Sequence, residues 1–285
     1  TDEQSITIDG QTISYSSVDT PGAVDWAKKG VEIVLECSGK FRIPALLQPY
    51  FDQGIKKVIV AAPIKEGALN IVVGCNDNLY RPNEHHLITA ASCTTNAIVP
   101  VLKCLLDEYG INDGHVETVH AYTNDQNLID NYHKGDRRGR SAALNMVLTS
   151  TGAAKAVAKA IPELKGKLTG NAIRVPTPNV SMAILNLQLG RETSVEDLNE
   201  FLRQKALHSS LQQQIGYTVS TEAVSTDFVG SRQACVLDSQ ATIVDGNSCV
   251  LYCWYDNEFG YSCQVVRCLE KFAGVVWPSY PLEGE

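Results

Sequence analysis

Cys93 is the residue whose surroundings most clearly suggest chemistry. It lies in the segment Ser92-Cys93-Thr94-Thr95-Asn96, between an apolar strand expected to end at Ala91 and a helix expected to begin directly after it. At the N-terminus of a helix, free backbone N–H groups and the helix dipole stabilise a thiolate and lower the thiol pKa. The pattern therefore predicts that Cys93 is a nucleophile.

The other eight of the nine cysteines are expected to be inert packing thiols, because cysteine is among the residue types most often buried. Cys93 differs from them because its neighbours are small and hydroxylated rather than apolar. The chain has no C-x-x-C pair and no Cys/His cluster at zinc-ligand spacing, so no metal site is predicted. The eight lie in or beside apolar patterns: Cys37, Cys75, Cys104, Cys235, Cys249, Cys253, Cys263 and Cys268.

A thiolate nucleophile needs a base or a cation, and His120 is the best placed of the six histidines. It ends an alternating strand that starts at Val116 and is followed by Ala121-Tyr122-Thr123-Asn124-Asp125. A strand terminus can present a side chain to a site. A structural histidine is the alternative, and the residues alone leave both interpretations open.

Two further segments suggest a site for anions. Residues 150–154, Ser-Thr-Gly-Ala-Ala, place hydroxyls and a glycine at a predicted helix start, which is typical of an anion site or of an ordinary N-cap. Arg174 is a charge within an apolar strand, and such a residue is normally paired with a carboxylate or a ligand phosphate. The run at 136–140, Asp-Arg-Arg-Gly-Arg, is by default expected to be a solvated loop.

The elements that must position these residues follow two patterns. Up to Cys93, a hairpin around Asp9-Gly10 is followed by short apolar strands that alternate with helices, which is typical of a parallel sheet covered on both faces. After the helix expected at 94–109, longer strands predict a domain with a mostly antiparallel sheet. The expected strands are 31–36, 57–62, 70–74, 86–90, 116–122, 167–175, 180–189, 234–237, 241–244 and 249–255. The other expected helices are 43–53, 151–161, 195–206 and 259–272.

The composition is that of an ordinary globular protein, with 285 residues, 44% hydrophobic and 20% charged residues, and a net charge of −8. This length has room for two domains, and disordered and collagen-like classes are excluded. The negative charge argues against a nucleic-acid partner, because such binding relies on neutralising phosphates. No apolar run approaches the roughly 20 residues that span a bilayer, and the polar start lacks signal-peptide features, so a cytoplasmic protein without membrane association is expected.

Five segments of the chain resemble motifs of the phosphorylating glyceraldehyde-3-phosphate dehydrogenase family, in the family's order and over nearly the whole chain. They are Ala91-Ser92-Cys93-Thr94-Thr95-Asn96, His120-Ala121-Tyr122-Thr123-Asn124-Asp125-Gln126, Ser150-Thr151-Gly152-Ala153-Ala154-Lys155, Arg174-Val175-Pro176-Thr177 and Trp254-Tyr255-Asp256-Asn257-Glu258-Phe259-Gly260-Tyr261.

The resemblance implies an aldehyde dehydrogenase that uses NAD or NADP and forms 1,3-bisphosphoglycerate from glyceraldehyde 3-phosphate. Cys93 would add to the aldehyde carbon, His120 would be the base, and inorganic phosphate would release the acyl thioester. The implied substrate- and phosphate-binding residues are Ser92, Thr94, Thr123, Thr151, Gly152 and Arg174. The implied cofactor-binding residues are Ser38, Gly39 and Asn257.

The resemblance also implies the fold class and the assembly. The fold is α/β, with a partial Rossmann cofactor domain at 1–92 and 258–285 and an α+β catalytic domain at 93–257 whose sheet is mostly antiparallel. The segment 122–144 would line the cofactor site of a neighbouring subunit, which implies a homotetramer. The small-molecule partners would be a phosphorylated aldehyde and inorganic phosphate.

The chain departs from the family pattern at several places. No G-x-G-x-x-G is present, and nothing before Thr1 matches the family's first strand and glycine-rich pyrophosphate loop, which is therefore expected to be absent from this chain. Asp125 stands where many members have a second threonine, and its charge would repel a substrate phosphate. Ala61 replaces a hydroxyl residue and Phe259 a tryptophan.

Three alternatives remain open at this point. Erythrose-4-phosphate dehydrogenase is suggested by Asp125 and opposed by Thr123. The chain could also be a non-catalytic family member, because the missing pyrophosphate loop should weaken cofactor binding. A cysteine hydrolase that uses Cys93 and His120 is opposed by the motif around Asn257.

Overall fold

The computed structural model describes residues 4–276, which form two compact units. The smaller unit contains the residues up to 69 together with 81–89, and the larger contains 70–80 and the residues from 90 onward. Both units mix helices and strands, so the α/β class is confirmed. The division into a cofactor domain and a catalytic domain at 93 and 257 stays a prediction.

The smaller unit begins with the predicted hairpin and continues into a parallel sheet. Strands β1 (Ser5–Ile8) and β2 (Gln11–Ser14) pair antiparallel, and the turn residues Asp9 and Gly10 have φ values of 49° and 78°. Two residues with positive φ are what a tight two-residue hairpin turn requires.

The sheet of this unit has the order β3-β4-β6-β5, with β3 (Ile33–Glu36), β4 (Lys57–Val60) and β6 (Leu87–Thr89) parallel. Helix α1 (Pro44–Asp52) packs on this sheet and buries Leu47 in its core. The expected strand 70–74 is wrong beyond β5 (Leu69–Asn70). The Asn76 side chain accepts a hydrogen bond from the N–H of Val72 and donates one to the carbonyl of Asn70, so local side-chain bonds replace a strand ladder.

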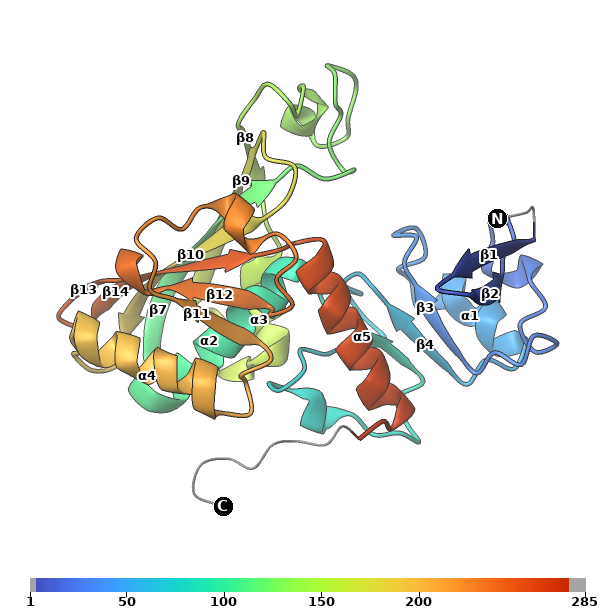
Figure 1. The fold of residues 1–285 in the computed structure, drawn as a ribbon, viewed down its shortest axis with the longest axis horizontal. Coiled ribbons are helices and arrows are strands. Elements are labelled where there is room, and N and C mark those ends of the chain that lie inside the picture. Colours follow the sequence, from blue (N-terminus) through green and yellow to red (C-terminus); the bar gives the residue numbers. More distant parts are fainter. Residues whose placement is uncertain (1–3, 277–285) are drawn as a thin grey trace. The chain divides into compact units, whose positions relative to one another are not determined.

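The larger unit is built on one sheet with the order β11-β12-β14-β10-β7-β9-β8, and β13 pairs with β14 (Figure 1). Only the pairs β7 with β9 and β11 with β12 are parallel, so the mostly antiparallel sheet is confirmed. The strands are β7 (Ile111–Ala121), β8 (Val147–Ser150), β9 (Leu168–Val175), β10 (Ser181–Leu189), β11 (Ile215–Thr218), β12 (Cys235–Asp238), β13 (Ile243–Asp245) and β14 (Ser248–Tyr255).

Helices cover this sheet and close its core. They are α2 (Cys93–Tyr109), α3 (Ala153–Ala160) and α4 (Val195–His208), and α5 (Phe259–Ala273) contacts α2. Helix α2 is almost entirely buried between the sheet and its neighbouring helices, and its residues Ile98, Val101 and Leu105 lie in the main core cluster. The helix that carries Cys93 is therefore anchored in the core of the larger unit.

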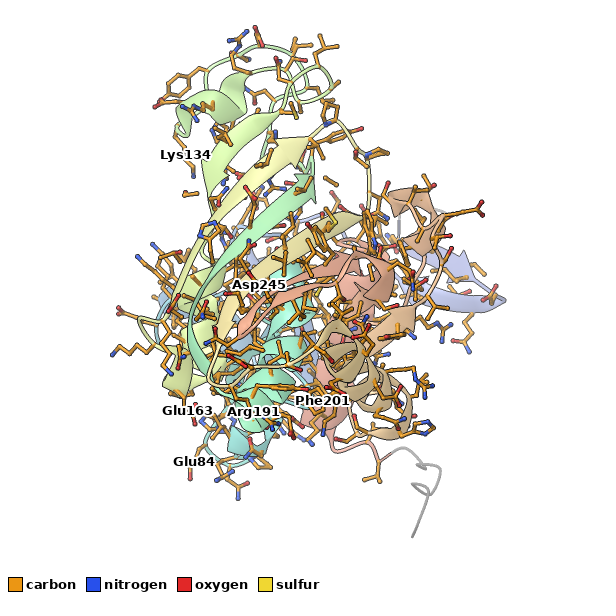
Figure 2. The ribbon with its side chains drawn as sticks, turned by 90° about the vertical axis from the view of Figure 1, so that its left-hand side faces the viewer. Glu84, Lys134, Glu163, Arg191, Phe201 and Asp245 are labelled. Carbon is orange, nitrogen blue, oxygen red and sulfur yellow. The ribbon has the colours of Figure 1, made fainter. Side chains whose placement is uncertain are left out.

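The segment 122–146 between β7 and β8 extends away from the sheet, at the top of Figure 1 and around Lys134 in Figure 2. It contains the short 3-10 helix η3 (Asp136–Gly139). The other 3-10 helices are η1 (Pro21–Ala23), η2 (Asp77–Leu79), η4 (Pro162–Leu164), η5 (Ser225–Phe228) and η6 (Ser239–Ala241). Within residues 4–276, no helix has the length and apolar character needed to cross a membrane.

Candidate active site

The turn before α2 holds Cys93 by a set of local hydrogen bonds. Ser92 is the N-cap residue, and its Oγ accepts a hydrogen bond from the N–H of Thr95 over 3.1 Å. The Asn96 amide donates to the carbonyl of Ser92 over 2.9 Å. Ala91 has a φ of 53°, in the left-handed region that costs free energy for a non-glycine residue, and Tyr261 donates to its carbonyl over 2.9 Å. The strained turn is thus fixed from both sides of the cysteine.

The structure brings Cys93 and His120 together, as the sequence predicts. His120 is the penultimate residue of β7, and its Nε2 lies 3.6 Å from the Sγ of Cys93. Because β7 and β9 run parallel with His120 opposite Arg174, the guanidinium lies beside the imidazole. A nucleophile, a base and a cation therefore share one site.

His120 is held neutral by its environment. Burial lowers its pKa to about 4, and the charges of Arg174 and Arg138 act in the same direction. Its Nδ1 lies 2.7 Å from the carbonyl oxygen of Ala121, and when Nδ1 carries the proton it donates to that oxygen. Nδ1 also lies 2.7 Å from Nη1 of Arg174, which can only donate, so its two neighbours favour opposite tautomers. The tautomer with the proton on Nδ1 is the one that leaves the lone pair of Nε2 facing the thiol.

The expected lowering of the Cys93 thiol pKa is not found in this chain. Burial raises the pKa of Cys93, whereas the Thr94 hydroxyl and the Arg174 guanidinium act to lower it. The loss of water around the sulfur outweighs the helix start that the sequence suggests. Cys93 as a whole residue is only partly buried.

The Arg174 guanidinium has one nitrogen in contact with the protein and one without a hydrogen-bond partner. Its Nη1 lies 2.7 Å from Nδ1 of His120 and donates to the carbonyl of Ala121 over 2.9 Å. Its Nε is buried and has no hydrogen-bond partner. A buried guanidinium nitrogen without a partner is costly and fits a site that binds an anion.

The hydroxyl groups of the predicted phosphate site bond mainly to the protein itself. The Ser92 Oγ lies 2.7 Å from the Oγ1 of Thr95, and the Thr94 Oγ1 lies 2.9 Å from the Tyr255 hydroxyl. The Thr151 Oγ1 accepts from the N–H of Ala153 over 3.2 Å. These bonds define local turns and a buried network.

Thr151 and Gly152 lie at the start of α3, where Gly152 is the N-cap residue and makes no side-chain cap. Among the described residues, no hydrogen bond joins either of them to Cys93. Their membership of the same site stays a prediction.

Thr123 and Asn257 lie just after the strands that the sequence assigns to them. Asn257 follows β14, is buried, and accepts a hydrogen bond at Oδ1 from the Ser181 hydroxyl over 2.8 Å. Thr123 follows β7, and its carbonyl accepts from the N–H of Gln126. The Gln126 side chain is buried with both amide atoms unpartnered, a feature with no signal in the sequence.

Arg138 is a site residue that sequence reasoning missed. It forms an ion pair with Asp125, its Nε donates to the Oγ1 of Thr149 over 3.0 Å, and its charge lowers the pKa values of both His120 and Arg174. The expectation of a solvated loop is therefore wrong for Arg138. The Arg138 guanidinium also balances the Asp125 carboxylate, which removes the simple argument that Asp125 repels a substrate phosphate.

Ser38 and Gly39 lie in the smaller unit, directly after β3. The N–H of Ser38 donates to the Glu36 carboxylate over 2.7 Å, the Tyr50 hydroxyl donates to the same carboxylate over 2.9 Å, and Gly39 has a φ of 70°. Ligands of open α/β sheets bind beyond the carboxyl ends of parallel strands. The cofactor role of Ser38 and Gly39 stays a prediction.

Most other cysteines behave as expected. Cys104, Cys235, Cys249, Cys253 and Cys268 are buried, Cys75 and Cys263 are partly buried, and all are free thiols. Cys37 is exposed, so its expected burial is wrong; it follows the last residue of β3 and is not part of the strand. In the part of the chain that the structure describes, no group of three or more His, Cys, Asp or Glu side chains could hold a metal ion.

Comparison with known proteins gives consistent matches. Residues 92–257 match the family model described as "Glyceraldehyde 3-phosphate dehydrogenase, C-terminal domain". A "Glyceraldehyde-3-phosphate dehydrogenase-like protein" of Pseudomonas aeruginosa (strain UCBPP-PA14) is 57% identical over 283 residues, which cover 98% of this chain and 61% of the relative. "Glyceraldehyde-3-phosphate dehydrogenase 3" of Nostoc sp. is 46% identical, covering 94% of this chain and 80% of the relative. "Glyceraldehyde-3-phosphate dehydrogenase" of Priestia megaterium is 44% identical, covering 95% and 81%.

Proposed function

Because the chain belongs to the glyceraldehyde-3-phosphate dehydrogenase family, we propose that it oxidises glyceraldehyde 3-phosphate to 1,3-bisphosphoglycerate with NAD or NADP and inorganic phosphate. The observation that carries the proposal is the contact of 3.6 Å between the Sγ of Cys93 and the Nε2 of a neutral His120. This pair can deliver a thiolate to an aldehyde carbon.

Cys93 and His120 perform the proton and bond changes. His120 takes the thiol proton as the sulfur forms its bond to the aldehyde carbon, and returns that proton to the resulting alkoxide. His120 then removes the hydroxyl proton as hydride leaves the same carbon, so that a thioester on Cys93 remains. Attack by inorganic phosphate on the thioester carbon breaks the C–S bond and releases the acyl phosphate, and the Cys93 thiolate takes back the proton held by His120. Because burial raises the Cys93 pKa and lowers that of His120, the resting pair is uncharged.

The nicotinamide cofactor, when bound, supplies the acceptor for that hydride. Asn257 would hold the carboxamide, because its amide is buried at the end of β14 and its Nδ2 has only a long contact of 3.3 Å with Glu258. Ser38 and Gly39 would contact the nucleotide at the end of β3.

Arg174 would bind the substrate phosphate through its free Nε, and Thr123 would assist it. Arg138 would add a second cation, which Asp125 orients. Thr151 and Gly152, with Ser92 and Thr94, would bind inorganic phosphate. The Thr94 hydroxyl would keep its hydrogen bond with Tyr255 while it contacts the phosphate.

We also propose that the working form is a homotetramer. The projecting segment 122–146 exposes a run of large apolar side chains that a lone protomer would leave in water. The exposed residues are Leu128, Ile129, Tyr132, Leu144 and Met146. A second copy of the chain would cover them.

Formation of reduced nicotinamide from glyceraldehyde 3-phosphate, cofactor and phosphate tests the function. We expect turnover that requires phosphate and is lost in Cys93→Ser, with Cys268→Ser as the matched control because that thiol is buried in α5. Comparing kcat/KM for the triose and for erythrose 4-phosphate decides the substrate. Absence of turnover with either sugar would contradict the proposed function.

A further inference from the structure

The feature that the proposed mechanism leaves unused is a line of three hydroxyl groups behind Cys93. The Oγ1 of Thr118 lies 2.7 Å from the Oη of Tyr255, which lies 2.9 Å from the Oγ1 of Thr94. The Thr94 Oγ1 in turn lies 4.0 Å from the Sγ of Cys93, within reach for a hydrogen bond to sulfur. The line thus runs from β7 through β14 to the first turn of α2.

Each member of this line is buried, so water cannot complete the hydrogen bonds. Thr118, Thr94 and Tyr255 are 1%, 6% and 2% exposed. Each hydroxyl has one proton to donate. If Thr118 donates to Tyr255 and Tyr255 donates to Thr94, the Thr94 proton is left to point at the sulfur. Hydrogen bonds in such a chain polarise and strengthen one another.

The Ser181 hydroxyl is a further hydrogen-bond partner of Tyr255. Its hydroxyl donates to the Oδ1 of Asn257 over 2.8 Å and accepts from the N–H of Ala121 over 3.1 Å. Its single proton is therefore committed, so it can only accept from Tyr255 and competes with Thr94 for the Tyr255 proton. In the proposed arrangement, Tyr255 donates to Thr94.

We propose that Tyr255 is a positioning residue that orients the Thr94 hydroxyl as a hydrogen-bond donor to the Cys93 thiolate. The inference rests on the proposed role of Cys93 as the nucleophile. Tyr255 itself touches neither substrate nor cofactor in this account. A thiolate that accepts a hydrogen bond is stabilised relative to the thiol, so the line of hydroxyls partly offsets the cost of burying the charged sulfur.

Other groups face the same sulfur and must be kept constant in the test. The titratable or charged side chains that act on Cys93 are His120 from β7, Arg174 from β9 and Tyr255 from β14. A variant that removes only the Tyr255 hydroxyl leaves the first two in place. Tyr255→Phe is that variant, because it keeps the ring that packs edge-on against His120.

The test measures how fast iodoacetamide alkylates Cys93 at each pH of a series. Mass spectrometry of the peptide that contains Cys93 gives the rate. For Tyr255→Phe we expect the midpoint of the profile to move to higher pH and the rate at neutral pH to fall about fivefold, the factor of one ordinary hydrogen bond. The limiting rate at high pH should stay unchanged. A purely structural loss would change the limiting rate without moving the midpoint.

Four further variants make the outcome specific. Thr94→Val should give the same shift as Tyr255→Phe, the double variant should shift no further, and Thr94→Ser should restore the wild-type midpoint. Tyr217→Phe is the matched control, because its hydroxyl bonds to the Asn199 carbonyl away from the site. An unchanged midpoint in Tyr255→Phe, or additive shifts in the double variant, would overturn the proposal.

The assay needs no turnover, so its failure is separable from failure of the proposed function. A midpoint shift without dehydrogenase activity would leave the hydroxyl line standing and reject the function. Dehydrogenase activity with an unchanged midpoint would support the proposed function and reject the role of Tyr255.

Discussion

The proposed chemistry depends on one uncharged imidazole held between a thiol and a guanidinium. His120 lies 3.6 Å from the Cys93 sulfur, and the Nη1 of Arg174 lies 2.7 Å from its other ring nitrogen. Burial and the neighbouring arginines keep this ring deprotonated well below the usual histidine range. The result is a base that is ready at neutral pH without first losing a proton.

The same shift makes the stability of the chain depend on pH. The folded-state pKa of His120, about 4, lies below its unfolded value, so the unfolded state binds the proton first and stability falls between about pH 6.5 and pH 4. In His120→Gln the free energy of unfolding should fall by on the order of 3 kcal/mol less than in the wild type over this pH range. Thermal unfolding followed by circular dichroism across that range measures it, with the exposed His208→Gln as control. Parallel profiles for wild type and His120→Gln would contradict the assigned environment.

Part of the site could be predicted from the sequence, and part could not. His120 and Arg174 are polar residues within apolar strands, and Cys93 stands among small and hydroxylated residues at a helix start. Tyr255 gained its role only through a partner far away in the sequence, since Thr94 lies 161 positions from it. The partners of Arg138 are nearer, but they belong to a loop and a short strand without a periodic pattern. A buried tyrosine in a strand signals that a partner exists, but not which one.

At the scale of elements, Asp256 joins β14 to α5 and fixes the direction in which Asn257 leaves the sheet. Its Oδ1 accepts from the N–H groups of Glu258 and Phe259 over 2.9 and 2.8 Å, and its Oδ2 accepts from the N–H of Gly230 over 2.7 Å. The carboxylate therefore caps the helix although it stands before the N-cap residue.

Asp256→Ala should destabilise the fold by about 2 kcal/mol, because it leaves three backbone donors without their acceptor. Urea unfolding measures the change, and the exposed Asp245→Ala, at the end of β13 in Figure 2, should stay within about 0.5 kcal/mol of wild type. Equal losses in the two variants would refute the cap.

The sequence predicted most long elements because their apolar periodicity is strong, as for α2 and β10. It missed β8 and β11, each of four residues, whose pairing partners β9 and β12 decide their conformation. The boundary of α3 was early by two residues because the Thr151 hydroxyl forms a turn before the helix.

At the scale of the whole molecule, the projecting segment 122–146 has an apolar surface that the proposed tetramer would bury. Tyr132→Asp, at 88% exposure, should dissociate the tetramer into smaller species, because a charge would be buried in the new interface. Sedimentation velocity gives the mass. Val219→Asp, also exposed and apolar but outside the segment, should stay tetrameric. A Tyr132→Asp tetramer of unchanged stability would place the interface elsewhere.

The central claim is that catalysis passes through a thioester on Cys93. Mixing the chain with cofactor and glyceraldehyde 3-phosphate without inorganic phosphate should trap this species, since the attacking group is missing. Acid quenching and peptide mass spectrometry should then find the phosphoglyceroyl adduct on the Cys93 peptide, and added phosphate should remove it. An adduct on any other cysteine, or turnover with phosphate but no adduct without it, would contradict the account.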